Sequence, residues 1–424
     1  MVDVAADRHR SADLVKLAAL FSVAVFVFSI PYENGVSVPG VGSFARLVGI
    51  GAFSITIVSL FDEGRLRLRS PSLFLLVAVA YLLWSAASYL WSIDPSRTLG
   101  RVTSLTQLVA MAWMIHQVAA TKWQRDLLAQ AFVFGAYAAV LLALAFRLGN
   151  PETAYRDVGG MNPNWFSIGC ALAIPVAWGL ALRSKRRVMF WINALYPLFA
   201  VAVVVLAASR GGMITTLVAL SVIPLTMPRL ALGRRVLLVA ILALVTGGVT
   251  VLGPQSYREL GPNIERLVQA PDELAEGTLT GRTTIWEVGY EAFRDAPLVG
   301  HGAGTFSRAV AEDLGRPRGA HNGYLSVVVA VGVIGLALYL GMFIVAAAST
   351  WLAMHRRLEL LVLLVTVAVA LLPANMEHTK PIWFVLSLVA VSRPVHLGSE
   401  TRVGGIADVP THLQKSWGRA VGSG

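Results

Sequence analysis

Residues 321–349 read HNGYLSVVVAVGVIGLALYLGMFIVAAAS, a polar pair followed by an apolar run without a single charge. The run is longer than the roughly 20 apolar residues that a helix needs to cross a bilayer, so it predicts a membrane-spanning helix. His321 and Asn322 then stand at the membrane surface, where this helix begins. At the positive end of a helix an imidazole is expected to stay neutral, and a neutral imidazole can accept a proton.

The composition also indicates a membrane protein. Hydrophobic residues make up 56% of the chain and charged residues 14%, with a mean hydropathy of +0.66, whereas soluble domains are about 25% charged. The net charge of +11 would suggest a nucleic acid partner in a soluble protein. Here basic residues in short loops orient the chain in the bilayer, and we expect no nucleic acid partner. The single cysteine, Cys170, excludes an internal disulfide and a cysteine-based metal cluster.

The predicted fold class is all-α: a polytopic transmembrane bundle of about 12 spans with one long extracytoplasmic loop that contains short helices. No small-x-small cleavage site follows the first apolar run, so it is interpreted as a retained helix. The predicted spans are 14–30, 43–61, 72–91, 101–120, 126–147, 164–182, 188–207, 212–228, 234–253, 323–350, 358–375 and 380–394.

Basic residues predict the orientation. With the N-terminus inside, the inner segments hold 21 Lys and Arg, and the short outer segments hold seven. The positive-inside rule therefore places both termini in the cytoplasm. We expect a multi-pass protein of the cytoplasmic (inner) membrane with its site facing the periplasm or exterior. The transmembrane domain is predicted over 1–394, and the Gly-rich tail 395–424 is expected to be a disordered cytoplasmic segment.

The long outer loop, 254–320, is the one candidate extracytoplasmic subdomain. Thr283 to Arg294 predicts a short amphipathic helix whose aromatic face is expected to pack onto the membrane domain, and this face consists of Trp286, Tyr290 and Phe293. The stretch Gly300 to Gly304 predicts a turn. An earlier helix is expected over Ser256 to Val268.

Two arginines of outer segments are candidate ligand contacts. Arg210 lies in the turn Ser209-Arg210-Gly211-Gly212, where small neighbours allow a ligand to approach the backbone. Arg282 opens the amphipathic helix, where a phosphate would meet both a guanidinium and free N–H groups. The alternatives are a structural anchor for Arg210 and a pair with Glu287 or Glu291 for Arg282.

Other polar residues have both a functional and a structural interpretation. Arg97 and Arg101 share a helix face and either extend the cationic cluster or pair with Asp94. Asn322 suits a helix N-cap, and His321 itself can be a polar cap. Asn162 and Asn164 begin the sixth span, where a cap is the favoured interpretation.

The last outer loop contains the run Asn375-Met376-Glu377-His378-Thr379-Lys380 between two apolar spans. Glu377 and Lys380 either form a structural pair or line a cavity that opens outward. Gly332 and Gly335 are expected to allow close helix packing. No Asp-x-Asp pair occurs, and we expect neither a metal nor a cofactor.

Six motifs in this order resemble those of the O-antigen ligase and Wzy-type polymerase superfamily of polytopic glycan transferases. The most specific is His321-Asn322 with Gly332 and Gly335, which matches the ligase pattern H-[NSQ]-x9-G-x-x-G at every position. The resemblance covers about residues 70–390. The other five motifs are Trp91–Ser96, Gly160–Asn164, Ser209–Gly212, Gly281-Arg282 with Trp286, and Pro297–Gly302.

This resemblance implies a GT-C type glycosyltransferase that acts outside the membrane. It implies transfer of a saccharide from undecaprenyl diphosphate to an acceptor hydroxyl of a glycan or lipid, with inversion and without a metal. It further implies that Arg210 and Arg282 bind the diphosphate and that His321 is the base. Arg97, Arg101, Asn164, Asn322, Glu377 and Lys380 are the predicted substrate-binding residues.

Within the superfamily, the ligase interpretation leads because the His321 motif fits it fully. A Wzy-type polymerase, whose acceptor is another lipid-linked repeat unit, is the alternative. Protein O-glycosylation is less favoured because no domain follows the last span. A polar-lipid transporter or flippase would also use a cationic cavity, but transporters more often show paired repeats and broken midplane helices.

Overall fold

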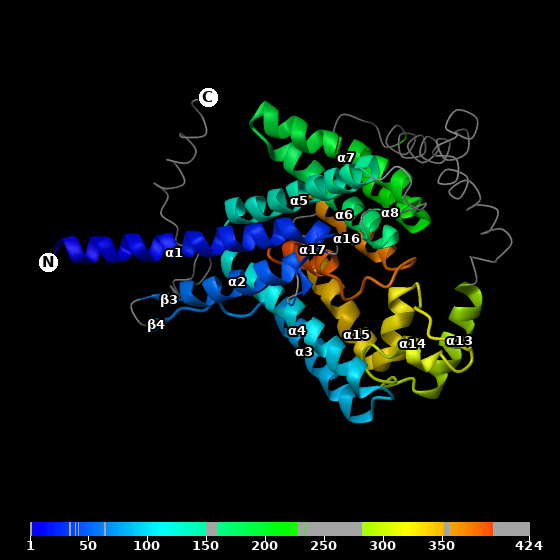
Figure 1. The fold of residues 1–424 in the computed structure, drawn as a ribbon. Coiled ribbons are helices and arrows are strands. Elements are labelled where there is room, and N and C mark those ends of the chain that lie inside the picture. The colour runs from blue at the N-terminus through cyan, green and yellow to red at the C-terminus, as the bar shows by residue number, and fades with distance from the viewer. Residues whose placement is uncertain are drawn as a thin grey trace.

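The computed structural model describes residues 2–33, 35–38, 40, 42–62, 65–149, 158, 160–227, 233, 282–351 and 357–392. These residues are almost entirely helical and form a bundle (Figure 1). The N-terminal half contains α1 (Val2–Ser29), α2 (Phe44–Ser59), α3 (Leu73–Ala87), α4 (Pro95–Val118), α5 (Lys122–Gly149), α6 (Pro163–Arg183) and α7 (Arg187–Ala207). The remainder contains α8 (Arg210–Leu220), α9 (Val222–Thr226), α13 (Arg282–Asp295), α14 (Phe306–Ala309), α15 (Gly323–Trp351), α16 (Leu358–Ala370) and α17 (Lys380–Ala390).

Short elements connect some of the helices. Two 3-10 turns, η1 (Ile30–Tyr32) and η2 (Ser88–Trp91), extend α1 and α3. Two antiparallel hairpins flank α2. They are β1 (Ser37–Val38) with β2 (Gly42–Ser43), and β3 (Phe61–Asp62) with β4 (Arg65–Leu66).

The all-α polytopic class is confirmed. Every predicted span other than 234–253 overlaps helical structure, although 212–228 is divided between α8 and α9 and 358–375 extends beyond the end of α16. The span 234–253 lies outside the described residues. Among the described residues, six helical segments are long and apolar enough to cross a membrane: Asp13–Tyr32, Leu73–Trp91, Lys122–Gly149, Pro163–Arg183, Arg187–Ala207 and Gly323–Thr350. Shorter apolar helices cover Phe44–Ser59, Arg210–Thr226, Leu358–Ala370 and Lys380–Ala390. The total of about 12 spans stays a prediction.

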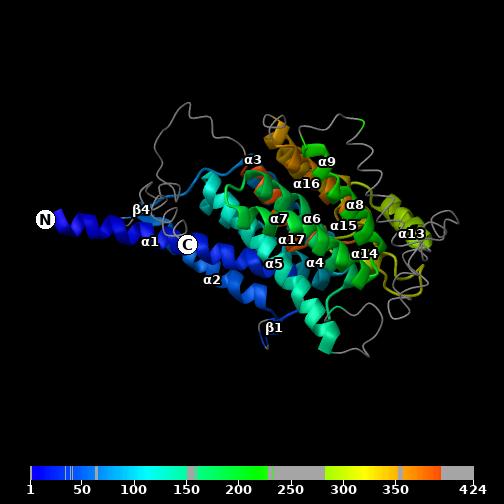
Figure 2. The same ribbon diagram turned by 90° about the horizontal axis from the view of Figure 1, so that it is seen from above.

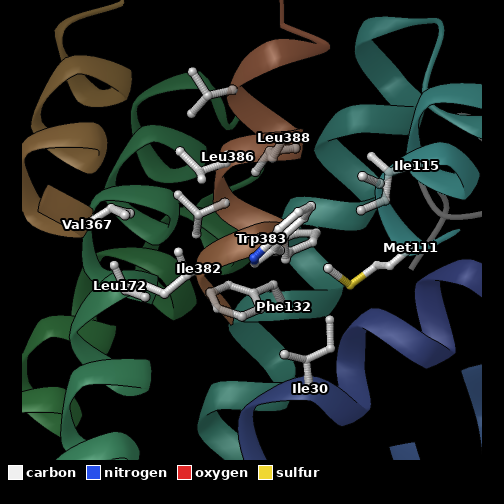
Figure 3. Packing of buried hydrophobic residues seen from close by; sticks show 14 of the residues in the cluster. Ile30, Met111, Ile115, Phe132, Leu172, Val367, Ile382, Trp383, Leu386 and Leu388 are labelled. Carbon is white, nitrogen blue, oxygen red and sulfur yellow. The ribbon is translucent and has the colours of Figure 1, made fainter. Parts of the chain in front are cut away.

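The core of the bundle surrounds α17. Its residues from Pro381 to Ala390 are all buried, as expected for a helix that is apolar on every side. Trp383 is fully buried and lies among side chains of α4, α5 and α6 (Figure 3). The ring centroids of Phe132 and Phe384 are 4.7 Å apart. The Trp383 indole donates to the carbonyl oxygen of Glu377 at 3.0 Å, so the core also fixes the loop that enters α17.

Helix α15 is interrupted within its third turn. Gly332 has φ 69° and ψ −174°, a conformation that only glycine adopts without strain. A Cβ on Gly332 would lie 2.1 Å from the carbonyl oxygen of Leu298. The first glycine of the His321 motif therefore marks a break in the helix, which corrects the interpretation that it serves helix packing alone.

The segment 297–302 satisfies the backbone groups that this break releases. The N–H groups of His301 and Gly302 donate to the carbonyls of Val329 and Ala330 at 3.0 and 2.8 Å. The Val333 N–H donates to the Pro297 carbonyl at 2.9 Å, and the Trp84 indole of α3 donates to Val331 at 2.9 Å. Two motifs far apart in the sequence, Pro297–Gly302 and the His321 motif, thus form one structural unit.

The described part of the loop 254–320 packs on α15. The predicted amphipathic helix is confirmed as α13, which lies with α14 at the side of the bundle opposite the N-terminal end of α1 (Figure 1 and Figure 2). Ile285, Ala292 and Phe306 form a buried cluster with Val329 of α15, and Trp286 and Phe293 pack against it. Tyr290 is 55% exposed, so its predicted place on the packed face is wrong. The helix expected over 256–268 and the tail 395–424 lie outside the described residues.

Candidate functional site

His321 lies in the last turn before α15. Asn322 caps this helix, because its Oδ1 accepts from the N–H groups of Tyr324 and Leu325 at 3.0 and 3.1 Å, as the sequence predicted. His321 has φ 47°, a left-handed conformation that is uncommon outside glycine and that a surrounding structure must hold in place. The residue is exposed to solvent on one side and is partly enclosed by protein on the other. The backbone therefore presents the imidazole outward at the start of α15.

The loop 371–379 between α16 and α17 holds this turn from one side. Asn375 Oδ1 accepts from the backbone N–H of Asn322 at 3.0 Å. The Gly323 N–H donates to the carbonyl oxygen of Leu371 at 2.7 Å. Both bonds engage the residues directly after His321 and fix its position relative to the loop.

Arg282 approaches His321 from α13. Trp286, one turn along this helix, donates through its indole N–H to the carbonyl oxygen of Ala320 at 2.8 Å. This bond fastens the first turn of α13 beside the residue that precedes His321. Burial, followed by the positive charge of Arg282, lowers the pKa of His321 from the ordinary value of 6.5. The imidazole is thus kept in the neutral form that a proton acceptor requires.

The short turn predicted over Ser209–Gly212 is confined to the residues before Arg210, which is the first residue of α8. Ser209 caps this helix by accepting from the Gly212 N–H at 3.0 Å. The Ser209 hydroxyl also donates to Asn164 Oδ1 at 2.9 Å, which joins the starts of α6 and α8. The predicted cap Asn162 is confirmed, because its side chain accepts from the N–H groups of Asn164 and Trp165.

The same loop 371–379 contacts the Arg210 turn. A Cβ on Gly211 would lie 2.9 Å from the side chain of Pro373. The loop therefore joins the start of α8 at Pro373 and the start of α15 at Asn375. The turns that carry Arg210 and His321 therefore both contact the loop 371–379. Arg282 is near His321 and belongs to α13.

Glu377 is the buried acid of this loop, with 4% of its surface exposed. Its Oε1 accepts from the Ser326 hydroxyl at 2.8 Å, lies 3.2 Å from His378 Nδ1 and is 4.0 Å from the Arg101 guanidinium. Burial alone raises the pKa of Glu377, but His378 and Arg101 outweigh it and hold the pKa below the ordinary value. The Glu377 carboxylate is thus charged, and it links the loop 371–379 to Arg101 of α4 and to Ser326 of α15.

The predicted pair of Glu377 with Lys380 is not formed. The Lys380 ammonium is paired with Glu33 at the end of η1, while Glu377 uses His378 and Arg101. Lys380 is the first residue of α17, and its side chain is directed toward Glu33 and away from Glu377. Glu377 and Lys380 are close in the sequence, but the turn between them directs their side chains to different partners.

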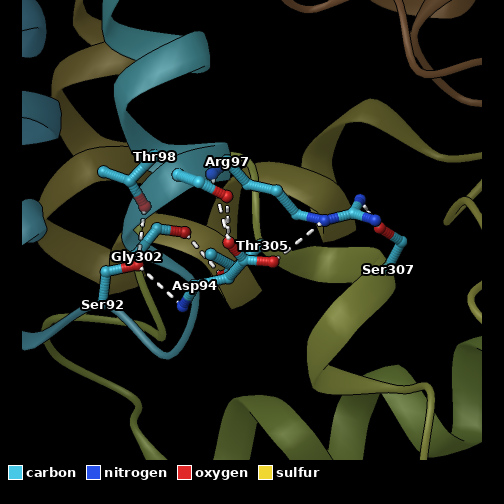
Figure 4. Close-up of polar contacts among 8 residues, drawn as sticks. Ser92, Asp94, Arg97, Thr98, Gly302, Thr305 and Ser307 are labelled. Atoms are coloured by element: carbon cyan, nitrogen blue, oxygen red, sulfur yellow. Dashed lines mark hydrogen bonds and ion pairs between the residues drawn. The ribbon is translucent and has the colours of Figure 1, made fainter.

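Arg97 contacts side chains at the start of α4 and in α14 (Figure 4). Its Nε is 3.1 Å from Asp94 Oδ2, and its Nη1 donates to the Ser307 hydroxyl at 2.7 Å. It joins the start of α4 to α14. The structural alternative, a pair with Asp94, is therefore the observed contact for Arg97, while Arg101 pairs with Glu377 instead.

Several neighbours of the site were missed by sequence reasoning. Ser326 and Asn375 each hold an element beside His321. His378 contacts both Glu377 and Trp165, whose ring lies edge-on at a centroid distance of 6.2 Å. The polar run 375–380 was a visible signal, but it did not indicate which of its members face His321.

Residues 195–340 match the family model described as O-antigen ligase. No curated protein matches the chain. The matched range includes Arg210, Arg282 and the turn of His321 and Asn322, and it covers α8 and the broken first half of α15. Arg97, Arg101, Asn164, Glu377 and Lys380 lie outside it.

Proposed function

This chain is a member of the O-antigen ligase and Wzy-type superfamily, a group of glycosyltransferase-like membrane ligases and polymerases, and from this premise we propose that it transfers a glycan from undecaprenyl diphosphate to an acceptor hydroxyl. The reaction takes place at the outer side of the cytoplasmic membrane. The observation that supports the proposal best is that His321 lies close enough to Arg282 to feel its positive charge. The hydrogen bond from Trp286 to Ala320 links the two residues' surroundings.

The leaving group is the first chemical requirement. As the bond between the anomeric carbon and the phosphate oxygen breaks, its electron pair and negative charge pass to the diphosphate. Arg210 and Arg282 each begin a helix, where guanidinium, backbone N–H groups and helix dipole all favour an anion. Guanidinium groups donate two parallel bonds to phosphate oxygens, so two of them can compensate the growing charge without a metal.

The acceptor hydroxyl is the second requirement. It forms the new bond to the anomeric carbon and loses its proton, which the neutral imidazole of His321 accepts. A base within hydrogen-bond reach contributes about 10²–10⁴-fold to such a step. Arg282 has two roles in this proposal, because it binds the diphosphate and keeps the pKa of His321 low. Attack opposite the diphosphate gives inversion at the anomeric carbon.

The ligase form of the reaction is the one we propose, since the His321 motif matches its pattern fully. The test is reconstitution of the purified protein with a glycan linked to undecaprenyl diphosphate and with candidate acceptors, in the presence of a chelator. Product sizing then separates the outcomes. One added block identifies a ligase and a ladder identifies a polymerase. No glycan transfer to any acceptor, or transfer that needs Mg²⁺ or Mn²⁺, contradicts the proposal.

A further inference from the structure

A second group of ionisable side chains lies at the end of the bundle opposite His321. Helix α16 begins and α17 ends there, whereas the loop 371–379 that joins them lies beside the His321 turn. Helix α6 packs against α5, α16 and α17 (Figure 1). A small cavity of about 20 Å³ lies between the ends of these four helices. Its charged lining consists of Arg125, Asp126, Arg183, Arg357 and Glu359.

The two carboxylates of this cavity are both engaged by Arg183. Its Nη1 donates to Glu359 Oε1 at 2.8 Å, and its Nη2 donates to Asp126 Oδ1 at 3.3 Å. Gly179 allows the close approach, because a Cβ there would lie 2.8 Å from Glu359 Cγ. The Nε of Arg357 is 3.5 Å from the same Glu359 oxygen. One carboxylate oxygen therefore serves two guanidinium groups.

Arg125 has no carboxylate partner of its own. Its Nη1 donates to the carbonyl oxygen of Ala120 at 2.7 Å, and within the described part of the chain no Asp or Glu oxygen forms an ion pair with it. Repulsion from Arg357 is stronger than the attraction of Asp126, and Arg69 adds to this repulsion. Three guanidinium groups thus line the cavity with only two carboxylates, so the lining is positive overall.

The start of α16 adds to the demand for an anion. Arg357 occupies the N-cap position of this helix, and its side chain forms no capping hydrogen bond. Side chains that carry an oxygen are preferred at this position, and the positive end of a helix favours a negative charge. Burial, followed by the charge of Arg183, lowers the pKa of Arg357. A half-buried cation in this situation is stabilised by an added anion.

The size of the cavity and its position indicate the class of anion. A volume of about 20 Å³ admits one group of the size of a water molecule, so a single oxygen of a larger anion can enter while the rest lies at the surface. Phosphate suits guanidinium groups, which donate to its oxygens in pairs. The turn directly after Arg183 is also basic, and its exposed residues are Lys185, Arg186 and Arg187. Basic pockets between the ends of membrane helices bind acidic headgroups.

We propose that this cavity is a phosphate-binding site, with one phosphoryl oxygen between Arg125 and Arg357. A phospholipid headgroup and free phosphate share this chemistry, and the place of the cavity at the helix ends favours the headgroup. The site is separate from Arg210 and Arg282, to which the proposed function assigns the donor diphosphate. Its occupant joins α5 to α16, and α16 leads into the loop 371–379 beside His321. Binding therefore stabilises the helices that carry this loop.

Thermal melting tests the site without any turnover. The full-length protein is placed in phosphatidylcholine nanodiscs that contain increasing fractions of phosphatidylglycerol, and the rise in melting temperature along this series gives the affinity. Arg125→Gln and Arg357→Gln should each weaken this affinity about tenfold, as expected for a lost charged hydrogen bond. Arg186→Gln is the matched control, because it removes the same charge from the exposed turn after α6. A merely structural role of Arg125 would lower the melting temperature equally at every lipid composition.

Inorganic phosphate distinguishes the two sources. A headgroup site responds to phosphatidylglycerol and not to inorganic phosphate added to phosphatidylcholine nanodiscs. A site for free phosphate responds to inorganic phosphate, and this response is lost in Arg125→Gln. Either result supports a phosphate site and names its occupant. No response to either probe overturns the inference, and so does an Arg186→Gln variant that loses as much affinity as Arg125→Gln.

Discussion

The indole N–H of Trp286 donates a hydrogen bond to the carbonyl oxygen of Ala320 at 2.8 Å, and this contact links the Arg282 helix directly to the residue before His321. It joins α13 to the residues at the start of α15, a helix that is long and apolar enough to cross a membrane. We therefore expect the relative position of the Arg282 guanidinium and the His321 imidazole to depend on Trp286.

Trp286→Phe should lower kcat while donor binding changes little. Phenylalanine keeps most of the packing but leaves the buried Ala320 carbonyl without its donor, at a cost of about 0.5–1.5 kcal/mol in the free energy of unfolding. Thermal melting and transfer kinetics are the measurements. Tyr290→Phe on the same helix is the control, since Tyr290 is exposed. A tryptophan variant with wild-type kcat would show that this contact does not position Arg282.

His321→Ala should reduce glycan transfer by about 10²–10⁴-fold, because the acceptor hydroxyl loses its base. The side chain is at the surface and its removal leaves no cavity, so the protein should accumulate in the membrane at the wild-type level. Donor binding, measured separately, should be retained. Turnover close to that of the wild type would exclude His321 as the base.

The pH–rate profile should show an acidic limb below pH 6.5, because burial and Arg282 lower the pKa of His321. A base works only when it is unprotonated, so a lowered pKa extends activity toward acid. In Arg282→Gln the imidazolium is no longer repelled by a neighbouring cation. The limb of the residual activity should therefore move to higher pH, and a limb that stays in place would mean that another group titrates.

Arg210→Lys should reduce kcat/KM for the lipid-linked donor by at least about tenfold, since an ammonium cannot form two parallel bonds to a diphosphate. Arg147→Lys, in the last turn of α5, serves as the control for a general effect of replacing an arginine by lysine. Kinetics identical to the wild type would assign Arg210 to the structural alternative, an anchor at the start of α8.

Gly332→Ala should destabilise the folded protein, since the methyl group would lie 2.1 Å from the Leu298 carbonyl oxygen. Backbone strain at φ 69° adds about 1–3 kcal/mol. Melting temperature and yield in the membrane should both fall. Gly51→Ala in α2 is the matched control, because nothing lies within 4 Å of its Cβ position. An unchanged melting temperature for the Gly332 variant would contradict the tight packing at the break.

Local patterns predicted the elements well, because hydrophobic runs, caps and aromatic spacing act within one or two helical turns. Thr283 to Arg294 formed a helix, and Asn322 and Asn162 formed caps. Contacts between distant segments could not be predicted in this way. Lys380 pairs with Glu33 and not with the nearby Glu377, because the turn into α17 directs the Lys380 side chain toward η1. No local signal revealed that Pro297–Gly302 completes the backbone of α15.

The break in α15 has a consequence for biogenesis. The carbonyls of Val329, Ala330 and Val331 accept from His301, Gly302 and Trp84, respectively, and the interior of a membrane has no water to replace these donors. Helix α15 therefore cannot complete its backbone hydrogen bonds until the segment 297–302, which precedes it in the chain, has docked against it. We therefore expect a chain with a damaged 297–302 segment to insert into the membrane and then to fail at a late folding step, the docking of this segment on α15.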